Sequence, residues 1–183
     1  SELGRCILRL QQYEQLMKRV VVQHELSGPG DPIRLNEIQA KKVELFADKT
    51  LGQVVKALTG SFLSSQSLES MRDKQEVDHP AGYICMRHNV TYSDENYDRE
   101  VQALAELVAL RNELVHHFVE RYDMLSEAGC LAAIAHLQAC YTQIDDHYIK
   151  LFERANGVSN ARAMMASFLS SPEVEEIFVH GMS

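Results

Sequence analysis

The stretch "ALRNELVHHFVERYDMLSEAGCLAAIAHLQ", residues 109–138, contains the junction between the two longest helical segments of the sequence. Apolar residues recur at helical spacing on both sides of the junction, which predicts one helix from about 96 to 125 and another from 126 to 156. Ser126 suits the N-cap of the second helix, and Gly157 stands where its C-cap is expected. Because almost nothing separates the two helices, we expect them to pack antiparallel.

Three shorter helices are expected before this pair, at about residues 2–26, 33–47 and 50–60. The first has apolar residues at helical spacing and ends at "SGPGDP", residues 27–32, a dense cluster of helix breakers. Thr50 and Gln53 have the spacing of a capping box, and Gly60 closes the helix that they open.

Residues 61–95 lose the helical period and are rich in serine and aspartate. Within them "GYICMRHNVTY", residues 82–92, alternates weakly like a strand. Near the end of the chain, Ser159 and the run "SPEVEE" from Ser171 are expected to open two short helices. The sequence therefore predicts an all-α fold: an antiparallel helical bundle with short terminal helices and an irregular insertion at about 61–95, in a single domain over residues 1–183.

The chain has 183 residues, of which 45% are hydrophobic and 24% charged, enough apolar material for one core. Its formal net charge of −8 argues against a protein that coats nucleic acid nonspecifically, because such binding depends on many lysine and arginine contacts with phosphates. Only local basic patches remain to attract an RNA, such as Arg5, Arg9 and Arg19 or Lys41 and Lys42.

The four cysteines, Cys6, Cys85, Cys130 and Cys140, form no Cys-x-x-Cys pair, and we expect them to be reduced and structural. The first residues have charges among their apolar side chains and lack the apolar core of a signal peptide. No stretch approaches the roughly 20 continuous apolar residues of a membrane span. These features predict a cytoplasmic protein without a membrane partner.

Arg111 stands where the helix over 96–125 should be most apolar. At about 100° per residue, it points to the centre of an apolar stripe made by Leu104, Leu107, Val108, Leu114, Val115, Phe118, Val119, Tyr122 and Leu125. A guanidinium cannot lose its proton, so an anion must meet it if it is buried. Two kinds of anion could meet Arg111. One is a carboxylate on a neighbouring helix, from Asp145, Asp146 or Glu153, and the other is a phosphate, whose oxygens suit the planar fork of arginine.

The residues just after this arginine are also polar. Asn112 and His116 are four apart, so they stack along one edge of the stripe, where an imidazole can move protons at neutral pH. His117 falls nearer the opposite edge. Glu113 and Glu120 are expected to face away from the stripe, toward water.

The run "RNELVH", Arg111 to His116, resembles the signature of the HEPN superfamily, in which Arg is followed by four to six residues and then His, with Asn, Asp or His favoured just after the Arg. Its place in a long helix of a small helical chain adds to the resemblance. The resemblance implies a metal-independent endoribonuclease of the kind found in toxin–antitoxin, phage-defence and RNA-processing systems, with no cofactor. It also implies a homodimer whose two motifs line one cleft, held in check by an antitoxin or another regulatory partner.

In such a dimer Arg111, Asn112 and His116 would be the catalytic residues. His116 would act as general base or acid while a ribose 2′-hydroxyl attacks the adjacent phosphorus. Arg111 would stabilise the added negative charge, and Asn112 would orient the imidazole or donate to a phosphate oxygen. A dimer also answers a geometric difficulty, because Arg111 and His116 point about 140° apart on one ideal helix. A two-fold axis beside the helix lets one chain's arginine serve beside the other's histidine.

Phe118 stands where one HEPN subgroup has a tyrosine that is nucleotidylated, so that form of control is not expected here. Some members of the superfamily have lost nuclease activity, and the alternative function is therefore a catalytically inactive helical module for dimerisation or partner binding.

A di-iron bundle is a further interpretation, because Glu113–His116 and Glu76–His79 both have the Glu-x-x-His spacing. It is disfavoured for two reasons. Glu76–His79 precedes Pro80 in the irregular segment, and Arg111 would repel a cation at the other pair. No histidine has the spacing of a zinc site either, so no metal is expected.

Overall fold

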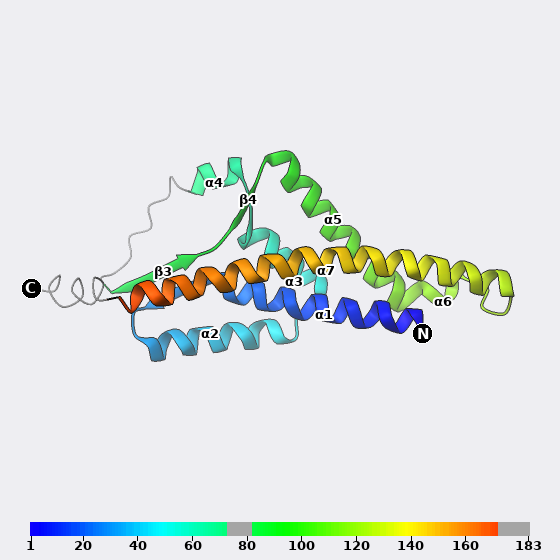
Figure 1. Cartoon of the computed structure of the whole chain (residues 1–183), viewed down its shortest axis with the longest axis horizontal. Helices are drawn as coiled ribbons and strands as arrows, with labels where there is room; N and C mark the ends of the chain where they lie inside the picture. The colour runs from blue at the N-terminus through cyan, green and yellow to red at the C-terminus, as the bar shows by residue number, and fades with distance from the viewer. Residues whose placement is uncertain (73–81, 172–183) are drawn as a thin grey trace, which may run out of the picture.

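The computed structural model describes residues 1–72 and 82–171 and shows a mainly helical chain (Figure 1). Its helices are α1 Glu2–Gln23, α2 Pro32–Ala47, α3 Leu51–Ser61, α4 Gln66–Arg72, α5 Asp94–Asn112, a π-helix Glu113–His117, α6 Phe118–Arg121 and α7 Glu127–Leu169. Its strands are β1 Glu25–Pro29, β2 Leu63–Ser65, β3 Tyr83–Arg87 and β4 Val90–Tyr92. The predicted all-α class is confirmed, with two small sheets as an addition.

α1 and α7 lie side by side and form the centre of the core (Figure 1). Each presents a buried face, made of Cys6, Leu10, Tyr13, Met17, Val20 and Val21 on α1 and Ala133, Leu137, Cys140, Ile144, Leu151 and Val158 on α7. The two helices run parallel: Cys6 Sγ donates to the carbonyl of Leu137 near one end, and Arg162 donates to the carbonyl of Gln23 near the other. The long chain between them allows this direction.

α5 and α7 run in roughly opposite directions, as predicted for the two central helices, but α5 is inclined to α7 and does not pack along it (Figure 1). Glu100, early in α5, binds Arg154, late in α7. Glu113, just after α5, lies 3.3 Å from His136, early in α7. Side-chain contacts therefore join α5 to α7 in opposite directions, whereas α1 and α7 pack side by side in parallel.

The start of α7 follows the prediction, but its end does not. Ser126 is the N-cap, as expected. The helix then continues through Gly157, the expected C-cap, as far as Leu169, so the short helix predicted from Ser159 is wrong. A glycine inside a helix costs only about 1 kcal/mol, and burial of the neighbouring Val158 in the core offsets that cost. The second expected terminal helix lies outside the described residues.

The segment 61–95 is more regular than predicted, because it contains β2, α4, β3 and β4. β3 pairs antiparallel with β1, and β4 pairs parallel with β2. The alternation over 82–92 therefore did indicate strands. The breakers at 27–32 separate α1 from α2, but their first residues belong to β1. A Cβ at Gly28 would lie 2.8 Å from Ile38 Cδ1, so a glycine there lets α2 pack against the strand.

The sequence also made predictions about a capping box, the cysteines and membrane-spanning helices. The capping box is confirmed, since the backbone N–H of Thr50 donates to Gln53 Oε1 at 3.0 Å. All four cysteines are free thiols, and Cys6 and Cys140 are buried. Within residues 1–72 and 82–171, no helix has both the length and the apolar character that crossing a membrane requires.

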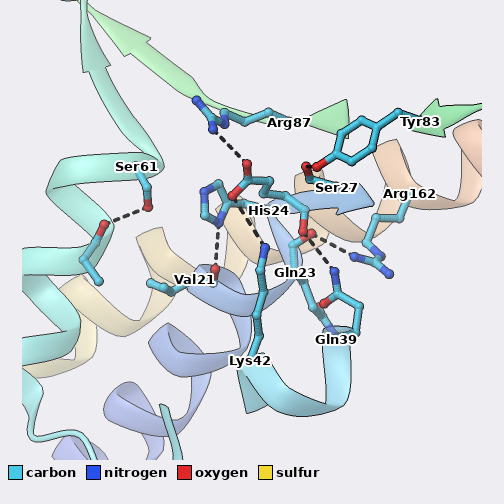
Figure 2. A network of polar contacts seen from close by, with 12 residues as sticks. Val21, Gln23, His24, Ser27, Gln39, Lys42, Ser61, Tyr83, Arg87 and Arg162 are labelled. Atoms are coloured by element: carbon cyan, nitrogen blue, oxygen red, sulfur yellow. Dashed lines mark hydrogen bonds and ion pairs between the residues drawn. The ribbon is translucent and has the colours of Figure 1, made fainter. Parts of the chain in front are cut away.

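Polar contacts at the end of α1 tie β1 and β3 to α2 and α7 (Figure 2). Glu25 of β1 accepts from Arg87 of β3 at 2.8 Å and lies 3.5 Å from the ammonium of Lys42 on α2. Gln39 of α2 donates to the backbone carbonyl of Glu25 at 3.1 Å. Burial alone would raise the pKa of Glu25, but the hydrogen bond and charge of Arg87, together with Lys42, lower it.

His24 is buried next to this network (Figure 2). Its Nδ1 lies 2.8 Å from the carbonyl of Val21, and its Nε2 has no hydrogen-bond partner among the described residues. The ring meets Phe62 edge to face, with centroids 5.6 Å apart. Because burial penalises the charged imidazolium, the pKa of His24 is lowered.

Acid is expected to destabilise the protein through His24. The folded protein keeps this imidazole neutral below its ordinary pKa of 6.5, whereas the unfolded chain takes up a proton as the pH falls through that value. The contribution of the neutral His24 to the free energy of unfolding is therefore fully present above pH 6.5. It is lost as the pH falls from 6.5 toward the pKa of His24 in the folded protein. Urea denaturation from about pH 7.5 to 5 should show a falling free energy of unfolding, with a shallower fall in His24→Gln.

His147, whose pKa burial also lowers, adds to the same slope, so the single variant should reduce the slope without abolishing it. His117→Gln, at an exposed imidazole, is the control and should keep the slope of the wild type. A slope in His24→Gln equal to that of the wild type would contradict the assignment.

A partly buried ion pair fixes α5 against α7. Arg154 donates to Glu100 at 2.7 Å and to the hydroxyl of Tyr92 on β4 at 2.5 Å. The side chains of Arg154 and Glu100 are 15% and 17% exposed. One guanidinium thus joins α7 to β4 and α5, two elements that follow one another in the sequence.

Removing either member of this pair should leave the other charge poorly solvated. We expect Glu100→Gln and Arg154→Met each to lower the free energy of unfolding by about 2–4 kcal/mol. The double variant should lose less than the sum of the two, because no unpaired charge remains. Chemical denaturation measures all three. Strict additivity would mean that the two side chains do not interact.

Candidate functional site

The helix expected over 96–125 is interrupted at the predicted motif. α5 ends at Asn112, and a π-helix over Glu113–His117 follows. α6 then ends at Arg121, and the chain turns before α7 begins. A π-helix bonds each residue to the fifth along the chain instead of the fourth, so its turn is wider and each residue rotates less. The prediction of one uninterrupted helix is therefore wrong within the motif.

Arg111 is half-buried and does not occupy the centre of a buried stripe. The buried positions are Leu107, Leu110, Leu114 and Phe118, so the core-facing direction passes beside Arg111. The guanidinium therefore lies at the margin of the core, where it reaches solvent.

The contacts of Arg111 include no carboxylate among the described residues. Its Nη1 donates to Asn112 Oδ1 at 3.2 Å. The two side chains line a small hollow of about 200 Å³ together with residues of α3 and α5, namely Thr50, Leu51, Gly52 and Val108. Asp145, a predicted partner, binds Arg9 instead, and the other two, Asp146 and Glu153, are exposed. The carboxylate partner expected from the sequence is thus not found.

His116 is exposed and lies within the π-helix. On an ideal α-helix it would point about 140° from Arg111. The smaller rotation per residue of a π-turn makes the angle between the two side chains smaller than this ideal value. The ring of His117 meets that of His116 edge to face at 6.3 Å, and its Nδ1 lies 3.4 Å from Glu120.

Glu113 does not face water, as the sequence predicted, but turns toward α7. It accepts a hydrogen bond from Arg121, across the π-helix, and lies 3.3 Å from Nε2 of His136 on α7. The nearby charge and hydrogen bond of Glu113 raise the pKa of Arg121. The ring of Tyr122 lies 5.6 Å from that of His136 and covers this cluster. Glu113 therefore attaches the π-helix to the long helix beside it.

Cys140 also lies near His136, but this group does not form a nucleophilic triad. The thiol is 3.2 Å from His136 Nε2, the same nitrogen that faces Glu113. A triad requires the two ring nitrogens to face different partners. Burial, with Cys6 and Glu113 nearby, raises the pKa of Cys140 to about 11, so the thiolate is scarce at neutral pH.

No cluster of three or more metal-ligating side chains occurs in the parts of the chain that the structure describes. Of the two Glu-x-x-His pairs, Glu76–His79 lies outside those parts, and Glu113 is occupied by Arg121 and His136.

Exposed apolar side chains flank the motif. Val115 and Val119, four residues apart, are 44% and 72% exposed, and Leu125 in the following turn is fully exposed. Met124 and Ile134 nearby in the sequence are also exposed. A contiguous patch of such side chains would be typical of an interface.

No family model, curated protein or solved structure matches this chain.

Sequence reasoning missed the π-helix and the residues that hold it, Arg121 and His136. No local signal marks them, since the run contains neither proline nor glycine. The predicted directions of Glu113 and His116 assumed regular α-helical rotation, and both change where the π-turn begins.

Glu113 should contribute to stability because it accepts a hydrogen bond from Arg121 of α6 and lies beside His136 of α7. Glu113→Ala is expected to lower the free energy of unfolding by about 1 kcal/mol, and the melting temperature by about 2–4 °C. Glu120→Ala is the matched control, since the only polar contact of this exposed glutamate among the described residues is with His117, within the same turn. Thermal melts that show equal losses in the two variants would contradict the role given to Glu113.

Proposed function

We propose that this chain is a metal-independent endoribonuclease whose catalytic residues are Arg111, Asn112 and His116. One observation carries the proposal: an accessible arginine without a carboxylate partner among the described residues stands five positions before an exposed histidine, across a π-turn. The fork of a guanidinium suits the oxygens of a phosphate, and an imidazole moves protons at neutral pH. π-turns inside helices are also frequent at functional sites.

The reaction would proceed by attack within the RNA strand. His116 of one protomer takes the proton of a ribose 2′-hydroxyl as its oxygen attacks the adjacent phosphorus. The bond from phosphorus to the 5′-oxygen breaks, that oxygen accepts a proton from an imidazolium, and a cyclic phosphate remains. Arg111 compensates the charge that builds up on the phosphate oxygens.

Asn112 has a narrower role than the sequence suggested. Its Oδ1 accepts from Arg111 at 3.2 Å, which orients the guanidinium. This contact leaves the amide nitrogen of Asn112 to donate to a phosphate oxygen. We therefore assign Asn112 to the phosphate and not to the imidazole.

The proposal includes a homodimer that acts in the cytoplasm as a toxin or phage-defence effector, restrained by an antitoxin or another regulatory partner. The exposed apolar residues Val115, Val119 and Leu125 support the dimer, because a two-fold contact through them would bury apolar surface and bring both motifs together. The same surface would serve the second candidate function, a catalytically inactive module for dimerisation or partner binding.

Cleavage in the presence of EDTA separates the two functions. The wild type should cut single-stranded RNA without added metal and leave cyclic phosphate ends, whereas His116→Ala should lose at least about 100-fold in rate. His117→Ala is the matched control, because it removes the neighbouring exposed imidazole and should keep most of the activity. Equal background cleavage by the wild type and His116→Ala would support the inactive module.

Arg111→Ala, measured in the same assay, should lose activity without losing the fold. Because Arg111 forms no ion pair within the described residues, the melting temperature of the Arg111→Ala protein should stay within about 2 °C of that of the wild type. A large loss of stability would instead show that Arg111 has a structural role.

A further inference from the structure

The exposed side of α1 carries a line of hydrogen-bond donors, with the carboxylates of Glu2 and Glu14 beside it. Its members recur every three or four residues and are Arg5, Arg9, Gln12, Gln15, Arg19 and Gln23. At 1.5 Å per residue this line is about 27 Å long. On a chain with a net charge of −8, such a stretch stands apart from the rest of the surface.

Three hollows follow one another along this line and share lining residues, the first two on the side of α7 and the third on the side of α2 (Figure 1). The first, of about 330 Å³, is lined by Arg9 and Gln12, and the second, of about 610 Å³, shares Gln12 with it. The third, of about 340 Å³, shares Gln15 and Arg19 with the second. We call these hollows together the α1 groove. α7 borders its first two parts, and α2 borders the third.

Aromatic rings of α7 alternate with the arginines of α1 in this groove. The guanidinium of Arg5 lies 4.5 Å from the centre of the Tyr141 ring, and that of Arg9 lies 3.9 Å from the centre of the Tyr148 ring. Phe152, one turn further, stacks on Tyr148 with an angle of 15° between the rings and is 48% exposed. Grooves that bind single-stranded nucleic acids combine cations, which contact the phosphates, with aromatic rings, on which the bases stack.

The charges along the groove favour an anionic ligand. The carboxylates of Glu2, Glu14 and Asp145 are each paired with a cation, Arg5, Lys18 and Arg9 respectively. Arg19 is exposed and has no carboxylate partner among the described residues. A guanidinium has five N–H donors, so Arg5 keeps donors for a second partner.

We infer that the α1 groove binds single-stranded RNA, with its phosphates at the arginines of α1 and its bases against Phe152. The groove begins at the N-terminal end of α1, the end of the molecule where α6 also lies (Figure 1). A strand held in the groove is thereby presented at the end that carries the motif. This inference rests on the proposed function for the identity of the substrate, whereas binding itself needs no cleavage.

A substitution at Asp145 should strengthen RNA binding, the opposite of what most substitutions in a binding site do. Its carboxylate holds Arg9 and lies among the groups that would contact the strand. Asp145→Asn keeps the shape of the side chain but removes the negative charge and frees Arg9 for a phosphate. This variant should therefore bind RNA more tightly than the wild type, at least about threefold by removal of one repulsive charge.

The experiment uses the full chain and a fluorescent single-stranded RNA of about 12 nucleotides that is 2′-O-methylated throughout, so that it cannot be cut. Anisotropy titrations from about 50 to 200 mM salt should show binding that weakens with salt. Phe152→Ala should weaken binding about tenfold through loss of stacking. Arg19→Gln should reduce the salt slope by about 0.7, the share of one phosphate contact on a single strand.

Lys56→Gln is the matched control, because it removes an exposed cation of α3, away from the groove, and should leave both the affinity and the salt slope nearly unchanged. Arg19, Phe152 and Lys56 are all exposed, so these variants should fold, and melting curves check this. A duplex of the same sequence should bind more weakly, since its bases cannot reach the rings.

Absence of binding by the wild type at low salt would overturn the inference and point to a protein as the occupant of the groove. Equal affinities of the wild type, Phe152→Ala and Arg19→Gln would also overturn it. Groove-dependent binding by a wild type that cuts no RNA would sustain the groove and refute only the nuclease. Cleavage that is unaffected by the groove variants would refute only the groove.

Discussion

The parallel contact between α1 and α7 is the interaction on which the rest of the structure depends. Each helix contributes a row of buried side chains, and full burial of one such side chain is worth about 1.5–3 kcal/mol. Because α1 stands near the start of the chain and α7 near its end, this contact holds all the intervening elements together. Polar contacts at its margins, Arg9 with Asp145 and Arg162 with the carbonyl of Gln23, fix how far one helix is shifted along the other.

The candidate site and the α1 groove both use what this pair of helices leaves exposed. α7 binds the π-helix through His136 on one side and presents Tyr148 and Phe152 beside α1 on another. A rigid helix thus supports the segment that carries Arg111 and His116 while also forming one wall of a groove. Function on such a scaffold requires no deep pocket, because an extended polymer contacts a long and shallow surface.

The net charge of −8 and a role in RNA binding are compatible if the cations are concentrated on one face. The arginines of α1 lie in one line, while the carboxylates next to them are paired. Repulsion elsewhere would lower nonspecific binding, since that binding depends on the number of phosphate contacts. Affinity would then depend on stacking and on few charges, which favours a single strand over a duplex.

The sequence by itself determined the helical segments, because apolar spacing, the capping box at Thr50 and the N-cap Ser126 act through near neighbours. It also singled out Arg111 and His116 as chemically unusual. Only the tertiary structure decided that α1 and α7 run parallel, that α7 continues through the expected stop, and that the motif contains a π-turn. These outcomes depend on which faces become buried and on contacts such as that of Glu113 with α7, between residues far apart in the chain, which no local pattern encodes.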